Sequence, residues 1–197
     1  MSVKIRPAQE RDLDALYALY AHARAFMAKN GNPTQWGQNR PSDLRIRQDV
    51  EQGIGYVLEE EGRVLAAFAL ADGPEPTYAE IRGAWKRDVP YGVIHRVACA
   101  EHGRGLAGQC IAFCKERYES LRIDTHENNH PMRALVAKCG FHSAGSSALK
   151  TGTSALPTNG MQNNKNNVDY QQGRMGFWLF SNEVGAKVWL FRKASKY

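Results

Sequence analysis

The sequence lacks a long hydrophobic run and an apolar leader. No stretch among its 197 residues approaches the length of a membrane span, and the first residues, MSVKIRPAQE, have no apolar core like that of a signal peptide. We therefore expect a cytoplasmic protein with no membrane partner. Hydrophobic residues make up 43% of the chain and charged residues 23%, which is typical of a globular domain with a sizeable core.

Cysteine is also scarce. The four cysteines are Cys99, Cys110, Cys114 and Cys139, a number that suits a reducing compartment. Cys110 and Cys114 share one face of a predicted helix, but no pair of His or Cys residues stands near them at the spacing of a zinc site. We interpret them as small core residues and predict no metal site.

A basic stripe of the kind that binds nucleic acid is missing too, although the net charge is +6. Residues 1–145 hold 19 Lys and Arg against 18 Asp and Glu, so a charge of +5 falls in residues 146–197. Because the predicted folded part is nearly neutral and carries no nucleic-acid motif, we do not expect nucleic acid as a partner.

Signature motifs of three other classes are absent. Asp124, Thr125 and His126 look like parts of a nucleophilic triad, but no Gly-x-Ser-x-Gly elbow occurs, which excludes that class of hydrolase. The glycines of residues 103–108 match neither the dinucleotide fingerprint nor the phosphate loop that ends in Gly-Lys-Ser/Thr.

The most informative stretch is residues 91–119, because its hydrophobic period changes at one glycine-rich point. An apolar, partly β-branched run predicts a strand up to Cys99, and apolar residues at helical spacing predict a helix from Leu106. Glycines between them let the backbone approach a ligand closely, and the first N–H groups of the helix point back at the loop. Together with Arg104, this arrangement favours an anion such as a diphosphate.

Upstream of this stretch, the pattern predicts a strand over residues 3–6 and a helix over 10–29. Ser42 is a suitable N-cap for a second helix over 43–52, and Glu61-Gly62 predicts a hairpin between strands 56–60 and 63–71.

The glycine-rich loop resembles the acyl-CoA-binding motif of the GCN5-related N-acetyltransferases (GNAT), Gln/Arg-x-x-Gly-x-Gly/Ala. His102 takes the first position in place of Gln or Arg, Gly105 the fourth and Ala107 the sixth. The resemblance continues downstream. Residues 121–126 are similar to the family's fifth strand, the helix after Asn129 to its following helix, and the pair Gly140-Phe141 to the start of its next strand. The sequence His-Arg-Val at 95–97 is similar to a subgroup of small bacterial members, and the resemblance covers about residues 3–145.

The resemblance implies an α/β GNAT fold, in which helices cover both faces of a mixed central sheet whose fourth and fifth strands splay apart. The pantetheine of acetyl-CoA, the implied co-substrate, would enter the gap and pair with the backbone, while the loop would hold the pyrophosphate. The cofactor-binding residues are then Val97, Cys99, His102, Gly103, Arg104, Gly105, Leu106, Ala107, Gly108 and Asn129.

The implied reaction is transfer of an acetyl group from acetyl-CoA to an amine of a small molecule or peptide, by direct attack of the amine on the thioester. His95 and His126 are the candidate catalytic bases, although each could instead be a structural hydrogen-bond partner. Val136 stands where the family commonly has a Tyr that protonates the leaving thiolate. A non-catalytic acyl-CoA-binding module therefore stays open, as does an inactive product of a frameshifted gene.

Two loops contain the candidate substrate-binding residues Trp36, Glu80 and Trp85. Trp36, between helix breakers, is either a lid over the substrate or a plug that covers the core. Glu80 and Trp85, together with Tyr78 and Asp88 of the same stretch, could line an acceptor-amine pocket or belong to an ordinary surface loop. The sequence leaves the oligomeric state open, with a homodimer as one alternative.

Residues 146–197 do not continue the resemblance. Their polar run at 161–167 has no strand alternation, so we predict one domain over 1–145 and an atypical tail that is disordered or out of frame. Reading from one base earlier, with suitable codons, turns residues 146–160 into IICLENGDERIAYQR, a strand, an Asn-Gly turn and a second strand. Without that hairpin, we expect an unpaired sheet edge and poor solubility.

Overall fold

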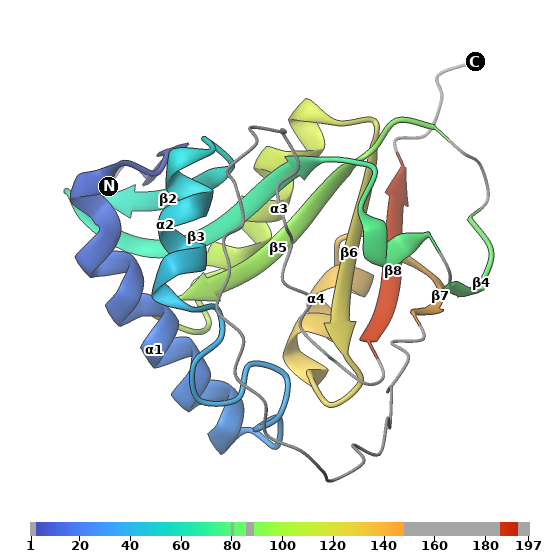
Figure 1. Ribbon diagram of the computed structural model, residues 1–197, viewed down its shortest axis with the longest axis horizontal. Helices are drawn as coiled ribbons and strands as arrows, with labels where there is room; N and C mark the ends of the chain where they lie inside the picture. Colours follow the sequence, from blue (N-terminus) through green and yellow to red (C-terminus); the bar gives the residue numbers. More distant parts are fainter. Residues whose placement is uncertain (1–2, 80, 86–88, 148–185, 193–197) are drawn as a thin grey trace, which may run out of the picture.

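The computed structural model describes residues 3–79, 81–85, 89–147 and 186–192, and it places one mixed sheet between two layers of helices (Figure 1). The elements in chain order are β1 (Val3–Pro7), the 3-10 helix η1 (Glu10–Asp12), α1 (Leu13–Lys29), α2 (Asp43–Glu51), β2 (Gly55–Glu60), β3 (Arg63–Asp72), η2 (Pro76–Tyr78), β4 (Ile81–Gly83), β5 (Gly92–Cys99), α3 (Leu106–Arg117), β6 (Ser120–His126), α4 (His130–Lys138), β7 (His142–Ser147) and β8 (Ala186–Arg192). The strand order is β1-β2-β3-β5-β6-β8-β7-β4. Among the paired strands, β5 and β6 run parallel and the others antiparallel.

Local sequence signals set the ends of the early elements. The Ser42 side chain accepts a hydrogen bond of 3.2 Å from the Arg45 backbone N–H, which caps α2. Glu61 and Gly62 both adopt positive φ, at 51° and 79°, and turn the hairpin between β2 and β3. The predicted strands and helices up to residue 71 are therefore confirmed to within a few residues.

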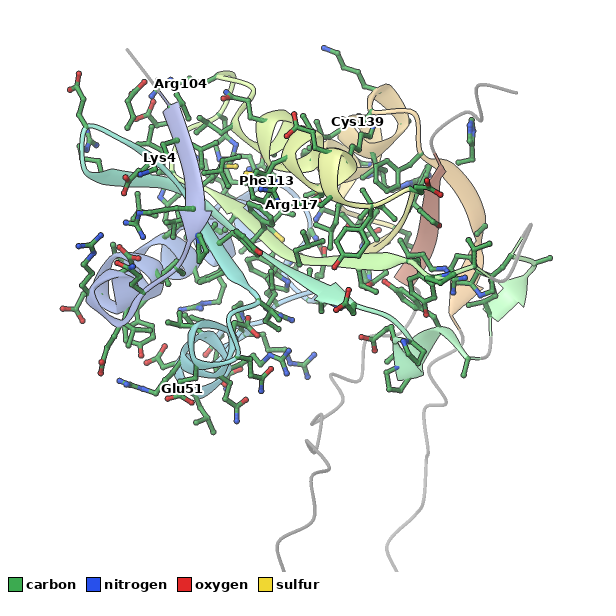
Figure 2. The ribbon with its side chains drawn as sticks, turned by 90° about the horizontal axis from the view of Figure 1, so that it is seen from above. Lys4, Glu51, Arg104, Phe113, Arg117 and Cys139 are labelled. Atoms are coloured by element: carbon green, nitrogen blue, oxygen red, sulfur yellow. The ribbon has the colours of Figure 1, made fainter. Side chains whose placement is uncertain are left out.

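The helices cover both faces of the sheet, as predicted. Figure 2 shows α1 and α2 on one side and α3 and α4 on the other. On the α3 side, the Phe113 ring packs edge-on against Tyr56 and Phe68, with ring centroids 5.3 and 5.9 Å apart. The Arg117 guanidinium lies 3.3 Å from the centre of the Phe113 ring and covers it from solvent.

A β-bulge interrupts β5 at its middle. Ala98 pairs with Ala67 and His95 pairs with Ala69, so two residues of β5 oppose one residue of β3. Arg96, inside the bulge, has a φ of 55°, which is unusual for a residue with a side chain. The bulge bends β5 before it reaches the glycine-rich loop.

Helices α1 and α2 both hold this bulge. The Arg96 guanidinium donates two hydrogen bonds to the carboxylate of Asp49 on α2, at 2.7 and 2.9 Å. The Tyr20 hydroxyl on α1 donates to the Arg96 carbonyl oxygen at 3.1 Å. Asp49 is 4% exposed, so the ion pair is largely shielded from water.

The expectation of an unpaired sheet edge after Gly145 is wrong. Strand β7 continues to Ser147, and β8 lies between β6 and β7, paired with β6 from Ser120↔Arg192 to His126↔Ala186 (Figure 1). The sequence did not indicate β8, because residues 188–191 are all apolar and show no alternation of apolar and polar residues. The expectation of poor solubility thereby loses its basis.

The remainder of the predicted atypical tail, residues 148–185 and 193–197, lies outside the described residues, and the frameshift stays a prediction. A second strand that the sequence did not indicate is β4, within the stretch 72–90 that we expected to be a loop. It is three residues long and pairs with the end of β7.

We predict that Asp49→Asn lowers the free energy of unfolding by about 2–3 kcal/mol, because it removes the carboxylate that pairs with Arg96 at 2.7 Å and with Arg45 at 3.0 Å. Urea denaturation measures this change. Arg47→Ala is the matched control on the same helix, since Arg47 makes an exposed ion pair with Glu10 at 3.7 Å and should leave stability unchanged within error. Equal losses in the two variants would contradict a special role for the Asp49–Arg96 pair.

Candidate active site

The predicted splay lies between β5 and β6. Their parallel pairing has three steps, from Gly92↔Leu121 to Ile94↔Ile123, and beyond Ile94 no pairing joins the two strands in the described chain. Figure 1 shows β5 and β6 diverging from this point, with α4 behind the gap. On its other edge, β5 stays paired with β3 as far as Cys99. The edge that contains Val97 and Cys99 thus faces β6 across the gap.

The glycine-rich loop follows β5 directly and leads into α3. Gly103 and Gly105 have φ of 84° and 70°, a region that residues with a side chain rarely adopt. A Cβ on either would meet no atom within 4 Å, so backbone conformation rather than crowding requires glycine. In the first turn of α3, the Ala107 N–H donates to the Cys99 sulfur, while the N–H groups of Leu106 and Gly108 have no i−4 carbonyl partner inside the helix, which suits an anion.

Two side chains of the loop have partners elsewhere in the fold. Arg104 donates to Glu60 at 3.0 Å and to Glu101 at 3.1 Å, and Figure 2 shows it at the outer end of the molecule, near β1. The His102 ring stacks on Phe26 of α1 with centroids 3.6 Å apart. A diphosphate at this loop would compete with the two carboxylates for Arg104.

A network of polar side chains surrounds His95 at the start of the splay. His95 Nε2 lies 3.3 Å from Glu75 Oε2, and His95 Nδ1 lies 3.9 Å from Asp124 Oδ1. The other oxygen of Glu75 accepts hydrogen bonds from the Thr77 N–H and hydroxyl, at 3.2 and 2.9 Å. The Tyr78 hydroxyl donates to Asp124 Oδ1 at 2.6 Å. Residues from the β3–β4 connection, β5 and β6 therefore meet at one point.

Burial and hydrogen bonds fix the protonation of two members of this network. Burial alone would raise the pKa of Glu75, but His95 and Thr77 together lower the pKa to about 2, so Glu75 is a carboxylate at neutral pH. Burial, followed by the neighbouring charge of Asp124, raises the pKa of Tyr78 well above 10 and keeps the hydroxyl protonated.

The candidate substrate residue Trp85 lies beside this network. Its indole Nε1 donates to the Tyr78 carbonyl oxygen at 3.4 Å, and its ring lies 3.6 Å from the Arg122 guanidinium. The Tyr91 ring lies 3.5 Å from the same guanidinium, so Arg122 is held between two aromatic rings.

Trp36 packs against the core beneath α1, with its ring centroid 5.8 Å from that of Tyr20. This is the packing expected of the plug alternative, and a contact of Trp36 with substrate stays a prediction. Glu80, the third predicted substrate residue, lies outside the described residues.

The acetyltransferase (GNAT) family model matches residues 13–141, which is more than half of the chain. The chain belongs to this family. Membership confirms the resemblance found in the glycine-rich loop, and acyl transfer from acetyl-CoA is the general activity that it supports. A comparison with curated proteins gave no match.

Solved structures of GNAT proteins share the fold. The GNAT acetyltransferase from Streptococcus agalactiae 2603 is 26% identical, with 98% of this chain and 96% of that chain covered and a TM-score of 0.74. A GNAT acetyltransferase from Listeria monocytogenes 4b F2365 is 17% identical, with coverage of 97% and 95% and a TM-score of 0.61. A chain of the NatC complex, solved with Gag peptide and CoA, is 12% identical, with coverage of 98% and 100% and a TM-score of 0.57. The last two similarities show the fold alone.

Three residues that the GNAT resemblance singled out have structural contacts. His126 Nδ1 accepts the Asn128 N–H at 3.1 Å, so one of its ring nitrogens is occupied in a turn. Asn129 caps α4 through the Met132 N–H, at 3.2 Å, and donates to Gln35 Oε1 at 2.9 Å. Val136 is fully buried in the core. His95 differs from these three residues, because a carboxylate oxygen lies near each of its two ring nitrogens.

Sequence reasoning missed Glu75. It named Tyr78 only as one of several residues that could line an acceptor-amine pocket, and Asp124 only as part of a hydrolase-like triplet that it rejected. Asp124 follows the last residue of β6 that pairs with β5, a position that a strand alignment could have indicated. Glu75 carried no such signal, because only the path of the β3–β4 connection brings it and Tyr78 towards His95. Across the part of the chain that is described, no group of three metal-ligating side chains occurs and no helix is long and apolar enough to cross a bilayer.

We predict that alanine affects the free energy of unfolding differently at Gly105, in the loop, and at Gly108, in α3. Gly105→Ala should lower the free energy of unfolding by about 1 kcal/mol, because its φ of 70° disfavours a side chain. Gly108→Ala, inside α3, should leave stability unchanged or raise it by up to about 1 kcal/mol, since its Cβ would meet only Leu135 at 3.9 Å. Urea denaturation compares the two. Tolerance of alanine at 105 would show that the loop does not hold this conformation in solution.

Proposed function

We propose that this GNAT protein is an acetyl-CoA-dependent N-acetyltransferase that acts on an amine of a small molecule or peptide by direct attack. The observation that carries the proposal is the position of His95, one residue beyond the last paired step of β5 and β6. A thioester that enters the splay from the glycine-rich loop would reach this point. There it would meet a histidine held by Glu75 and faced by Asp124.

The open edge of β5 and the loop suit the two halves of an acyl-CoA molecule. Amide groups of the pantetheine would pair with the backbone near Val97 and Cys99, as an added strand does. The N–H groups at the start of α3, with Arg104 and the positive end of the helix dipole, would attract the diphosphate. The NatC complex, which shares the fold, was solved with CoA, and this likeness supports the same class of co-substrate.

His95 is the base that the geometry favours. Because Nε2 faces the Glu75 carboxylate, we infer that the neutral imidazole carries its proton on Nε2 and leaves the lone pair on Nδ1. Glu75 would then stabilise the imidazolium that forms when Nδ1 takes a proton from the amine. Glu75 is thus a positioning residue for His95.

Direct attack fits the state of the cysteines better than a covalent acyl-enzyme. Burial raises the pKa of the Cys99 thiol to about 11, and the Ala107 N–H offsets this rise only in part. Burial likewise raises the pKa of Cys114 to about 12 and that of Cys110 well above its usual range. A nucleophilic cysteine needs a thiolate, and these three are thiols at neutral pH.

The buried Val136 favours a second candidate function, a module that binds acyl-CoA without turnover. A side chain in the core cannot protonate the leaving thiolate. However, thiols have an ordinary pKa of about 8.5, so a thiolate can leave near neutral pH without a dedicated acid. Turnover of acetyl-CoA with a panel of primary amines separates the two functions.

We predict that excess acetyl-CoA raises the melting temperature. At about a hundred times its dissociation constant, a ligand stabilises the native state by about 2.7 kcal/mol, which corresponds to a shift of several degrees. CoA is the matched second ligand, because it offers the same diphosphate and pantetheine. A cooperative melt that neither ligand shifts would overturn both candidate functions.

We predict that His95→Gln lowers kcat/KM for the amine by at least about 100-fold, because Gln cannot accept the proton. His126→Gln is the matched control and should retain most of the activity, since the Gln amide can also accept the Asn128 N–H. Both variants should keep the acetyl-CoA shift in melting temperature. Unchanged acetylation by His95→Gln at low and at high pH would remove His95 from the mechanism.

A further inference from the structure

The space between His95 and Asp124 has an unusual pair of facing atoms. Once Nε2 carries the imidazole proton, Nδ1 presents a lone pair towards Asp124 Oδ1, and the two atoms lie 3.9 Å apart. This distance is too long for a direct hydrogen bond, and both atoms are acceptors. Two facing acceptors repel each other unless a donor lies between them.

The described neighbours do not supply a donor at this position. Tyr78 has one hydroxyl proton, and it is directed to Asp124 Oδ1 at 2.6 Å. Thr77 donates to Glu75 instead. Among the described residues, no hydrogen bond joins a protein donor to Asp124 Oδ2. Apart from the imidazole itself when it is protonated, none of the described residues places a donor between the two atoms, and a bound molecule with N–H groups can take that position.

The local charge indicates what kind of donor fits. Glu75 and Asp124 bring two carboxylates, and the guanidinium of Arg122, two residues before Asp124 on β6, lies between the Trp85 and Tyr91 rings. The side chains of His95 and Asp124 remain 17% and 25% exposed, so a small group can reach them from solvent. A cation with several N–H donors satisfies both acceptors and reduces the excess of negative charge.

We propose that the acceptor binds as a primary ammonium ion that bridges Asp124 and His95 Nδ1, and that Asp124 selects cationic acceptors. This inference rests on the proposed acetyltransferase function and names its substrate class. Asp124 is then a substrate-binding residue. Acceptors with a carboxylate next to the amine are disfavoured, because that group would approach Glu75 and Asp124.

The bridge also gives a complete path for the protons. The ammonium gives one proton to His95 Nδ1 and becomes a neutral amine, whose lone pair attacks the thioester carbonyl carbon. The C–N bond forms, the C–S bond breaks, and the electron pair of that bond leaves on the thiolate. The second proton of the amine neutralises the thiolate, and the products are an amide, CoA and the proton on His95.

The test compares the full chain with Asp124→Asn and with Asp72→Asn. Asp72 is a matched control because it accepts a hydrogen bond of the same length, 2.6 Å, from a tyrosine hydroxyl, that of Tyr118. The first pair of probes is n-butylamine, a cation at neutral pH, and 2,2,2-trifluoroethylamine, which is largely neutral there. CoA release gives kcat/KM for each probe.

The second pair of probes measures binding and needs no turnover. The n-butylguanidinium ion, which is always charged, and its neutral analogue n-butylurea are each added to the protein saturated with acetyl-CoA, and the melting temperature is measured. This arm separates failure of cation binding from failure of catalysis.

We expect the wild type and Asp72→Asn to prefer n-butylamine and to melt higher with n-butylguanidinium than with n-butylurea. Asp124→Asn should lose roughly 10-fold or more of kcat/KM for n-butylamine, together with the extra thermal shift. A guanidinium shift that depends on Asp124, without turnover of either amine, would support the cation site and contradict the acetyltransferase. A wild type without the shift, or an Asp124→Asn variant that keeps the shift and the preference, would overturn this inference.

Discussion

The ion pair between Asp49 and Arg96 is the constraint on which the arrangement of the site depends. A residue with a side chain at a φ of 55° is unfavourable on its own, and two hydrogen bonds from α2 hold it there. The resulting bulge bends β5 while β6 continues, so parallel pairing stops after three steps. His95 stands just before the bulge and the glycine-rich loop just after it. One shielded contact between a helix and a strand therefore sets the relative positions of His95 and the glycine-rich loop.

The groups around His95 take different roles because their surroundings differ. Glu75 is a carboxylate because His95 and Thr77 supply donors to both of its oxygens. Tyr78 stays protonated because it is buried beside the charge of Asp124. The two ring nitrogens of His95 differ in their surroundings, because Glu75 lies 3.3 Å from Nε2 whereas Asp124, which accepts the Tyr78 hydroxyl, lies 3.9 Å from Nδ1. In contrast, burial is the largest effect on the thiols of Cys99, Cys110 and Cys114, and it raises the pKa of each.

The features that could be predicted from the sequence were those encoded locally. Ser42, Glu61-Gly62 and the glycines at 103 and 105 act through their own backbone, so the elements around them were predicted to within a few residues. His95 was also a candidate, because it lies on a recognisable strand. Its partner Glu75 was not, and the hydrogen bond of Tyr78 to Asp124 was not either, since the approach of both residues depends on how the β3–β4 connection crosses the sheet. Strand β8 was missed because four consecutive apolar residues do not distinguish a strand between two others from an isolated aromatic cluster.

The insertion of β8 between β6 and β7 has a consequence for the order of folding. The paired residues of β5 and β6 are 29 positions apart in the sequence and can meet early, but those of β6 and β8 are 60 to 72 positions apart. Contacts of such high sequence separation form late, because a long loop must be closed first. During synthesis, β6 and β7 must remain without their common neighbour until residues 186–192 have emerged from the ribosome. The side of the sheet formed by β6, β8 and β7 is thus the last to be completed, and until then the edges of β6 and β7 lack their partner.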